Sequence, residues 1–323
     1  MQTVDLQCKY CLGQLKVIGE NHYLCEHCGN EVIEQDNTPD ELQNLLISAY
    51  QDLRLTKFDD AQDRFTDIIE RYKDSYMAYW GLCLAEHGVV FVEDRIEDKM
   101  VPTCYNMEIK SFLDNPNYRK ALELAPAEQV KNYEYQASKI ELIRKEWIEK
   151  ANAIPPYDIF ISFKHRDEDG NVTSDYEYLN DLWHELTYKH NLNVFFSPQT
   201  LKDKVSEKFE PYIYRALHTS KIMLLYGEKP EYFETTWVKN EWTRYLRKIK
   251  NKEKHPKSLI VAYKNFNANL LPGKLKDTQA LDANKPQFIN ILFDHINNIL
   301  NLSQNVEKLE RIEIKSTAYI YSK

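Results

Sequence analysis

Four of the six cysteines form two pairs with the spacing of a metal site. Each pair has two residues between its cysteines, and thirteen residues separate the pairs, which are Cys8 with Cys11 and Cys25 with Cys28. A C-x-x-C turn puts two thiolates on one side of a tight knuckle, and two knuckles complete a tetrahedral zinc site. Four thiolates leave no open position for catalysis, so the pattern predicts a structural zinc ribbon within residues 1–36.

Two other chemistries fit these cysteines less well. Two disulfides would need an oxidising compartment, and the first residues do not resemble a secretory signal. A dithiol redox pair would not need a second copy. His22 and His27 could replace a thiolate, but with four thiolates available we expect both histidines to face solvent. Residues 1–35 hold two lysines against five acidic residues, a net charge of -3 that repels phosphate, so nucleic acid is an unlikely partner.

The composition is that of a globular protein with about two domains. The chain has 323 residues, of which 43% are hydrophobic and 28% charged, and its formal net charge is -8. The acidic balance argues against a protein that holds nucleic acid or an anionic membrane surface. Because no run approaches the roughly eighteen apolar residues of a membrane span, we expect a cytoplasmic protein with no membrane partner.

Glycine is scarce in the second half of the chain. After Gly88 the remaining glycines are Gly170, Gly227 and Gly273. Neither G-x-G-x-x-G nor G-x-x-x-x-G-K-[ST] occurs, which excludes a recognisable Rossmann or P-loop nucleotide site. Any nucleotide chemistry must therefore use another kind of pocket.

Residues 39–151 predict an all-helical segment. Apolar residues recur at intervals of three and four, as in Phe58, Ala61, Phe65 and Ile68. Together with Ala78 and the residues that follow, this stretch resembles one tetratricopeptide helical hairpin. A single hairpin does not build the groove of a repeat protein, so a helical spacer packed on its own core is the favoured interpretation.

A new domain is predicted over residues 155–302, followed by a tail at 303–323. Pro155 and Pro156 interrupt the helical pattern, and a β-branched and aromatic run follows at 157–163. Strand-like and helical segments then alternate, and the run 174–177 has the pattern of a capping box at the start of a helix. This order predicts an α/β fold with a flavodoxin-like parallel sheet and ligands beyond the carboxyl ends of its strands.

Three segments of this domain resemble the Toll/interleukin-1 receptor (TIR) family. The run Tyr157-Asp158-Ile159-Phe160-Ile161-Ser162-Phe163 resembles the first-strand box of TIR domains. The loop at 198–208 has the position of the BB loop, Glu207-Lys208-Phe209-Glu210 resembles the start of the helix after it, and Trp237-Val238-Lys239-Asn240-Glu241 resembles the W-x-x-x-E helix. The order of ribbon, helical segment and TIR domain resembles bacterial proteins of this class.

The resemblance implies an enzyme that cleaves NAD+. In the enzymatic branch of the family, a glutamate at the helix start after the BB loop is catalytic, and Glu210 has that place. Cleavage of the nicotinamide–ribose bond releases a neutral base, so one carboxylate can suffice where ordinary glycosidases need two. Glu210 would stabilise the developing oxocarbenium charge, and Glu207 is the competing carboxylate. Apart from the resemblance, a glutamate in a first helical turn reads as a complement to the helix dipole.

The resemblance also implies substrate contacts and partners. Phe163 and Lys164, directly after the first strand, and Trp237 are candidate substrate-binding residues, although Phe163 can equally be a core residue and Trp237 a packing residue. The expected product is nicotinamide with ADP-ribose or a cyclic ADP-ribose. We expect a homo-oligomer assembled through TIR domains and a role in anti-phage defence or signalling. The rival hypothesis is a non-catalytic TIR interaction module.

Overall fold

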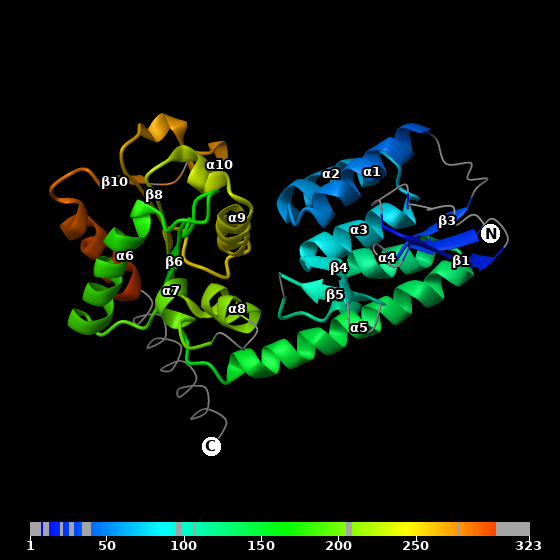
Figure 1. Ribbon diagram of the computed structural model, residues 1–323, viewed down its shortest axis with the longest axis horizontal. Helices are drawn as coiled ribbons and strands as arrows, with labels where there is room; N and C mark the ends of the chain where they lie inside the picture. Colours follow the sequence, from blue (N-terminus) through cyan, green and yellow to red (C-terminus); the bar gives the residue numbers. More distant parts are fainter. Residues whose placement is uncertain are drawn as a thin grey trace, which may run out of the picture. The chain divides into compact units, whose positions relative to one another are not determined.

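The chain divides into two units, which meet in the sequence between Ala153 and Ile154 (Figure 1). The computed structural model describes residues 8, 13–19, 22–25, 29–33, 40–94, 99–105, 108–204, 209–276, 278 and 280–301. The predicted tail at 303–323 lies outside these residues. Each unit is described by itself below.

The first unit begins with a small antiparallel sheet and continues with five helices. The sheet has the order β1-β2-β3, formed by β1 (Leu15–Gly19), β2 (His22–Cys25) and β3 (Glu31–Ile33). The helices are α1 (Asp40–Arg54), α2 (Phe58–Arg71), α3 (Tyr76–Glu86), α4 (Pro116–Leu124) and α5 (Ala127–Asn152). Helices α1 to α4 pack in chain order, α1 on α2, α2 on α3 and α3 on α4.

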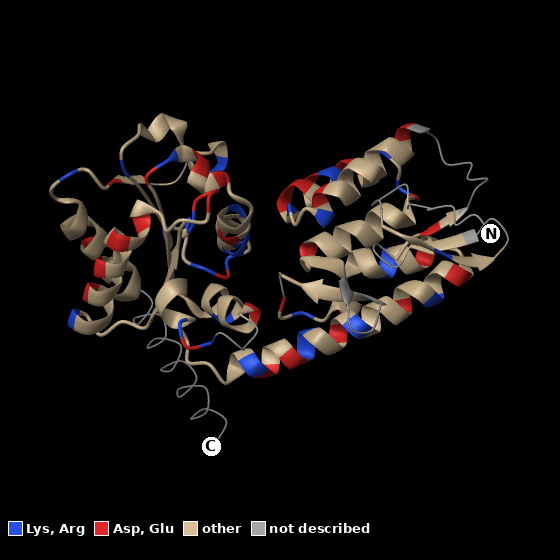
Figure 2. Cartoon of the chain, in the orientation of Figure 1, with Lys and Arg blue, Asp and Glu red and all other residues tan. Residues whose placement is uncertain are grey.

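The predicted periodicity of α2 is confirmed, because Phe58, Ala61, Phe65 and Ile68 are its buried residues. The long helix α5 has a buried stripe on one side and, as Figure 2 shows, charged residues of both signs along the rest of its surface. This is the amphipathic pattern of a helix that covers a core.

The prediction of an all-helical segment is wrong at residues 89–104. The described residues of this stretch form two strands that pair antiparallel, β4 (Val89–Asp94) and β5 (Lys99–Cys104), and a short 3-10 helix, η1 (Phe112–Asp114), comes later. Helix α3 ends before Gly88, whose φ of 56° lies in the left-handed region that glycine adopts easily. The β-branched and aromatic run that follows then favours a strand over a helix.

The second unit is built on a five-stranded sheet in which every pair of neighbours is parallel. Its order is β10-β9-β8-β6-β7. The strands are β6 (Ile159–Ser162), β7 (Val194–Phe196), β8 (Ile222–Gly227), β9 (Leu259–Tyr263) and β10 (Ala280–Asp282). Numbered along the chain, this order is 5-4-3-1-2, which is the flavodoxin-like arrangement. The predicted α/β class with a parallel sheet is confirmed.

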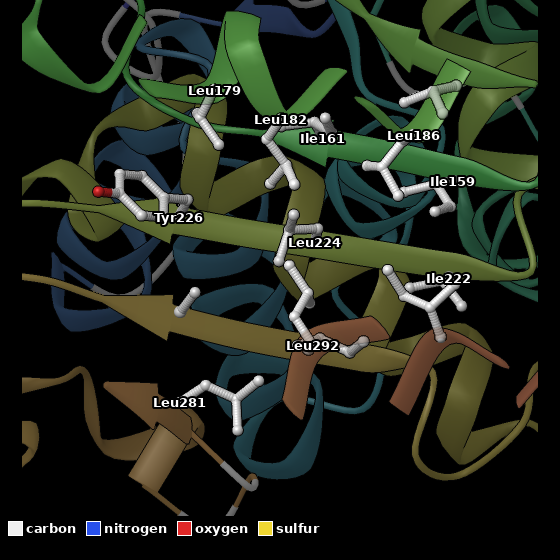
Figure 3. Packing of buried hydrophobic residues seen from close by; sticks show 14 of the residues in the cluster. Ile159, Ile161, Leu179, Leu182, Leu186, Ile222, Leu224, Tyr226, Leu281 and Leu292 are labelled. Atoms are coloured by element: carbon white, nitrogen blue, oxygen red, sulfur yellow. The ribbon is translucent and has the colours of Figure 1, made fainter. Parts of the chain in front are cut away.

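Helices cover both faces of this sheet (Figure 1). One face packs against α6 (Ser174–His184) and the last helix, residues 288–301, and the other against α8 (Glu210–Thr219) and α9 (Thr236–Lys250). Figure 3 shows Leu182 of α6 and Leu292 of the last helix on the same side of β8 as Leu224. The shorter elements are the π-helix η2 (Glu185–Lys189), α7 (Ser197–Thr200), η3 (Pro230–Glu234), η4 (Ala268–Leu270) and α10 (Gly273–Lys276).

The capping box predicted for α6 is not formed. The residue before the helix is Thr173, and its side chain makes no capping hydrogen bond. Its hydroxyl instead donates to the carbonyl of Lys164 at 2.6 Å, and the Ser174 hydroxyl donates to Oε2 of Glu228 at 2.9 Å. Both hydroxyls therefore hold loops at the carboxyl edge of the sheet instead of closing the helix end.

The contact between α2 and α3 depends on a glycine. A Cβ added at Gly81 would lie 2.3 Å from the ring of Phe65, which is fully buried. We expect Gly81→Ala to lower the free energy of unfolding by about 1–3 kcal/mol, because overpacking outweighs the gain in helix propensity of about 1 kcal/mol. Denaturant unfolding followed by circular dichroism measures this change.

Gly273 provides the control, because no atom lies within 4 Å of an added Cβ there. Gly273→Ala should change the stability by less than about 0.5 kcal/mol. Adding Phe65→Leu to Gly81→Ala should recover part of the lost stability, since the ring edge is removed. A Gly81→Ala protein as stable as the parent would contradict this packing.

Candidate functional site

The candidate site lies where the strand order of the second unit reverses. The chain leaves β6 to form β7 on one side, and β8 then pairs with β6 on the other side. In open parallel sheets a crevice outside the carboxyl ends of two such strands is where ligands bind. Here those ends are Ser162 of β6 and Gly227 of β8.

A carboxylate from α9 meets the end of β6. The hydroxyl of Ser162, which is 1% exposed, donates to Oε2 of Glu241 at 2.6 Å. Burial raises the pKa of Glu241 to about 7, although the Ser162 hydrogen bond acts in the other direction. Glu241 therefore exchanges its proton near neutral pH, as a carboxylate at a reactive site can do.

The sequence analysis quoted Glu241 only as part of a motif and did not consider it as a catalytic residue. The position of Glu241 in the sequence could nevertheless have identified it as a candidate. Glu241 lies three residues after Val238 and directly before Trp242, and both of these apolar residues are buried. A carboxylate on the buried side of an amphipathic helix needs a partner or a function.

Trp237 lies one turn before Glu241 and is exposed. Its relative exposure is 54%, whereas Trp242 is 1% exposed and donates from its indole Nε1 to the carbonyl of Phe233 at 2.8 Å. Trp242 is thus the tryptophan that packs α9 on the sheet. Residues four apart on a helix lie on the same side, so the Trp237 indole is placed beside the Glu241 turn.

Glu210 is the first residue of α8 and is half-buried. Pro211 follows it within the first turn, as is common at helix starts, and a negative charge there complements the helix dipole. α8 packs on the same face of the sheet as α9. Glu207, the competing carboxylate, lies outside the described residues.

The loop after β6 carries the other two predicted substrate residues. Phe163 is 7% exposed and stacks on Phe196, with ring centroids 5.3 Å apart, so it belongs to the core. Lys164 is half-buried. Next to it, burial and then the charge of Arg166 lower the pKa of His165, whose ring lies 5.4 Å from that of Tyr176.

A second polar group lies on the other face of the same edge, and the sequence analysis missed it. Glu228, directly after β8, accepts from Lys264 Nζ at 2.8 Å, from the Ser174 hydroxyl at 2.9 Å and from the Tyr226 hydroxyl at 3.3 Å. Burial acts to raise the pKa of Glu228, but Lys264 and Ser174 together lower it below its usual value. Glu228 is therefore an ionised anchor between loops.

Two of the four candidate zinc ligands are described, and both are fully buried. The amide of Cys8 donates to the carbonyl of Gly13 at 2.7 Å, and the amide of Cys25 donates to that of Asn30 at 2.9 Å. In both segments the cysteine amide therefore bonds to the carbonyl of the residue five positions later. Cys11 and Cys28 lie outside the described residues, and among the described ones no three His, Cys, Asp or Glu side chains are grouped to hold a metal ion.

The second knuckle is anchored on α5. The carbonyl of Gly29 accepts from Gln129 Nε2 at 2.8 Å and also from the Asn132 side chain. The Tyr133 hydroxyl donates to Oδ1 of Asn30 at 2.6 Å, and the Tyr133 ring stacks on Trp80 with centroids 4.2 Å apart. Residues 29 and 30, next to the second cysteine pair, are therefore fixed to α5.

Comparison with known proteins gives no relative: no family model, curated protein or solved structure matches the chain. Of the helices in the described part of the chain, none combines the length and the apolar character that crossing a membrane requires.

The raised pKa of Glu241 predicts a pH-dependent contribution to stability. Because the folded state holds this proton more tightly than the unfolded state, the contribution is full below the usual value of 4.5 and is lost as the pH rises through about 7. At about 1.4 kcal/mol per pKa unit, Glu241→Gln should gain roughly 3 kcal/mol relative to the parent between pH 4 and pH 8. Denaturant unfolding of the parent and of Glu241→Gln at both pH values measures the difference in stability between them. The same difference at pH 4 and at pH 8 would contradict the raised pKa of this half-buried carboxylate.

Proposed function

We propose that the second unit is a TIR-type NAD+ glycohydrolase, with the carboxylate of Glu241 as its catalytic group. The observation that carries this proposal is the half-buried Glu241 side chain, whose carboxylate accepts a hydrogen bond from Ser162 at the point where the strand order reverses. An exposed tryptophan one turn away offers a flat apolar surface to a planar base. These features supplement the family resemblance of the segments 157–163, 198–210 and 237–241.

The proposed reaction breaks the bond between the nicotinamide nitrogen and C1′ of the ribose. The bonding electrons go to the ring nitrogen, which was positively charged, so nicotinamide leaves as a neutral molecule and needs no proton. Positive charge then develops on the ribose, and an ionised Glu241 stabilises it. Attack by water on C1′ gives ADP-ribose and a proton, and attack by a nitrogen of the adenine gives a cyclic ADP-ribose.

The cationic nicotinamide ring of the substrate itself favours the charged form of Glu241. A positive charge within about 4–6 Å lowers the pKa of a carboxylate, so bound NAD+ opposes the effect of burial. The face of the Trp237 indole attracts a cationic ring at the same time, an interaction of about 0.5–2 kcal/mol. The site therefore gains its active charge state when the substrate enters.

Glu241 has stronger support from the structure than Glu210, the residue that the resemblance implies. Glu241 is held by a hydrogen bond from the end of β6 and its pKa is raised, which fits a group poised for chemistry. The position of Glu210 in the first turn of α8 can be explained by its favourable interaction with the helix dipole alone. Glu210 as the catalytic group, which the resemblance implies, is therefore the alternative assignment, and the same experiment tests it.

The test compares three Glu→Gln variants for release of nicotinamide from NAD+. Glu241→Gln should lower turnover by about 100-fold or more, because the preorganised charge is lost while the shape is kept. Glu210→Gln should stay within a few-fold of the parent. Glu234→Gln is the matched control, since Glu234 lies just before α9 with its side chain 49% exposed.

The outcomes separate the hypotheses. An inactive Glu210→Gln with an active Glu241→Gln would return the catalytic role to Glu210. A parent protein that releases no nicotinamide, alone or at high concentration, would favour the interaction module. Chromatography of the products distinguishes ADP-ribose from a cyclic product. Assembly through TIR domains and a role in defence are further parts of this proposal that rest on the resemblance. Cytoplasmic location is another part, and it rests on the sequence, in which no apolar run is as long as a membrane span.

We also propose that Cys8, Cys11, Cys25 and Cys28 bind one structural Zn2+. Support comes from the two C-x-x-C turns and from the burial of Cys8 and Cys25 in turns with the same backbone closure. Elemental analysis should give one zinc per chain in the parent and in Cys83→Ala, and much less in Cys25→Ser. Parent protein purified without zinc, or unchanged zinc in Cys25→Ser, would contradict the site.

A further inference from the structure

Asp175 is a buried carboxylate with no side-chain hydrogen bond. It is the second residue of α6, its exposure is 0%, and no side chain of the described residues donates a hydrogen bond to either of its carboxylate oxygens. An ionised carboxylate in this position is unfavourable, because it has lost its hydration and no side chain donates to it in return. Some species must neutralise it.

Two lysines lie near Asp175 and Glu228, but neither donates a hydrogen bond to Asp175. The charged groups that act on Asp175 are Glu228 after β8, Lys229 beside it and Lys264 after β9. Lys264 is already committed to Glu228 at 2.8 Å, and its Nζ lies 5.3 Å from the centre of the Tyr178 ring. Tyr226 and Tyr178 face the same group as neutral phenols, whose pKa values burial raises.

A proton suits this position better than a metal ion. Asp175 has no exposed surface, and Glu228 already accepts from Lys264, Ser174 and Tyr226. No third carboxylate, histidine or cysteine of the described residues joins the two acids. A divalent cation needs about six oxygen ligands and space for its waters, which this group does not offer.

We infer that Asp175 is protonated in the folded protein below neutral pH, and that its loss of the proton is a pH-sensitive switch for the two loops that border the β6–β8 edge. The first loop, 163–173, leads directly into Ser174 and Asp175. The second begins at Glu228 and leads to α9, which carries Trp237 and Glu241. When Asp175 ionises, two carboxylates oppose each other across these loops.

The groups around Asp175 determine in which direction its contribution to stability changes with pH, and over which pH range. Burial, and then the charge of Glu228, raise the pKa of Asp175 to about 7, while the Glu228 backbone, Lys264 and Lys229 act in the other direction. The folded state therefore binds this proton more tightly than the unfolded state does. The contribution to stability is full below the usual value of 3.8 and is lost as the pH rises through about 7.

The first test compares the parent with Asp175→Asn, which keeps the shape and cannot ionise. Asp181→Asn is the matched control, because Asp181 is an exposed residue of the same helix. Glu241 titrates in the same range, so the measured quantity is the difference in melting temperature between each variant and the parent. This difference should be near zero at pH 5.5 and should rise by several degrees for Asp175→Asn at pH 8.5, with no change for Asp181→Asn.

The second test locates the effect and needs no variant. Amide hydrogen exchange of the parent, expressed as protection factors to remove the intrinsic pH dependence, should show lower protection at 163–176 and 228–235 at pH 8.5 than at pH 6. Residues 210–219 of α8, on the opposite face, serve as the internal reference. Equal protection at both pH values would overturn the switch.

Two further results would also overturn it. A difference in melting temperature that does not change with pH would show that Asp175 does not titrate in this range. Stabilisation of the parent by millimolar Mg2+ or Ca2+ at pH 8.5, absent in Asp175→Asn, would identify a metal site instead of a proton. None of these measurements uses NAD+, so the inference can fail or succeed independently of the proposed enzyme activity.

Discussion

The reversal of strand order between β6 and β8 determines where polar groups can lie in the second unit. Strands β6 to β9 contain no charged residue, and Figure 2 shows the charged residues on the helices and in the loops. A parallel sheet covered on both faces needs such apolar strands. Hydrogen-bonding and titratable groups are therefore displaced to the carboxyl edge, where the chain turns toward opposite faces.

Strand alternation then separates the two acidic groups of this edge. Ile159, Ile161 and Phe163 face the layer of α6, while Phe160 and Ser162 face the layer of α8 and α9. In β8, Tyr226 lies on the α6 side, and Glu228 continues that side beyond the strand. Glu241 and the Asp175–Glu228 pair consequently border the same edge from opposite faces, because successive side chains of a strand point in opposite directions.

The sequence was sufficient to predict the features that depend on periodicity. Alternation of strand-like and helical runs predicted the parallel α/β unit, and spacing of three and four predicted the buried face of α2. The hairpin at 89–104 was missed because a β-branched run after Gly88 was read within a helical context. The predicted capping box at Ser174 does not form because the two hydroxyls bond elsewhere. The Ser174 hydroxyl donates to Glu228, and the Thr173 hydroxyl donates to the carbonyl of Lys164.

The site was less predictable, since burial of a single carboxylate depends on distant residues. Glu241 was visible in a motif, but its raised pKa arises from the packing of α9 on β6, which spacing does not describe. Asp175 reads as an ordinary acidic residue in a first helical turn, where such residues are common. Its burial follows from the layer formed by α6, β8 and the loop after β9, which meet only in the folded chain.

The two carboxylates place opposite demands on pH if the proposed function and the proposed switch both hold. Glu241 must lose its proton to stabilise a cationic transition state, whereas Asp175 must keep its proton to hold the bordering loops together. Each has a pKa raised to about 7 in the free protein. The cationic nicotinamide ring lowers the pKa of the carboxylate it approaches, which extends the working range of Glu241 toward acid without helping Asp175. Activity should then have a bell-shaped pH profile whose acid limb depends on bound substrate and whose alkaline limb depends on the fold.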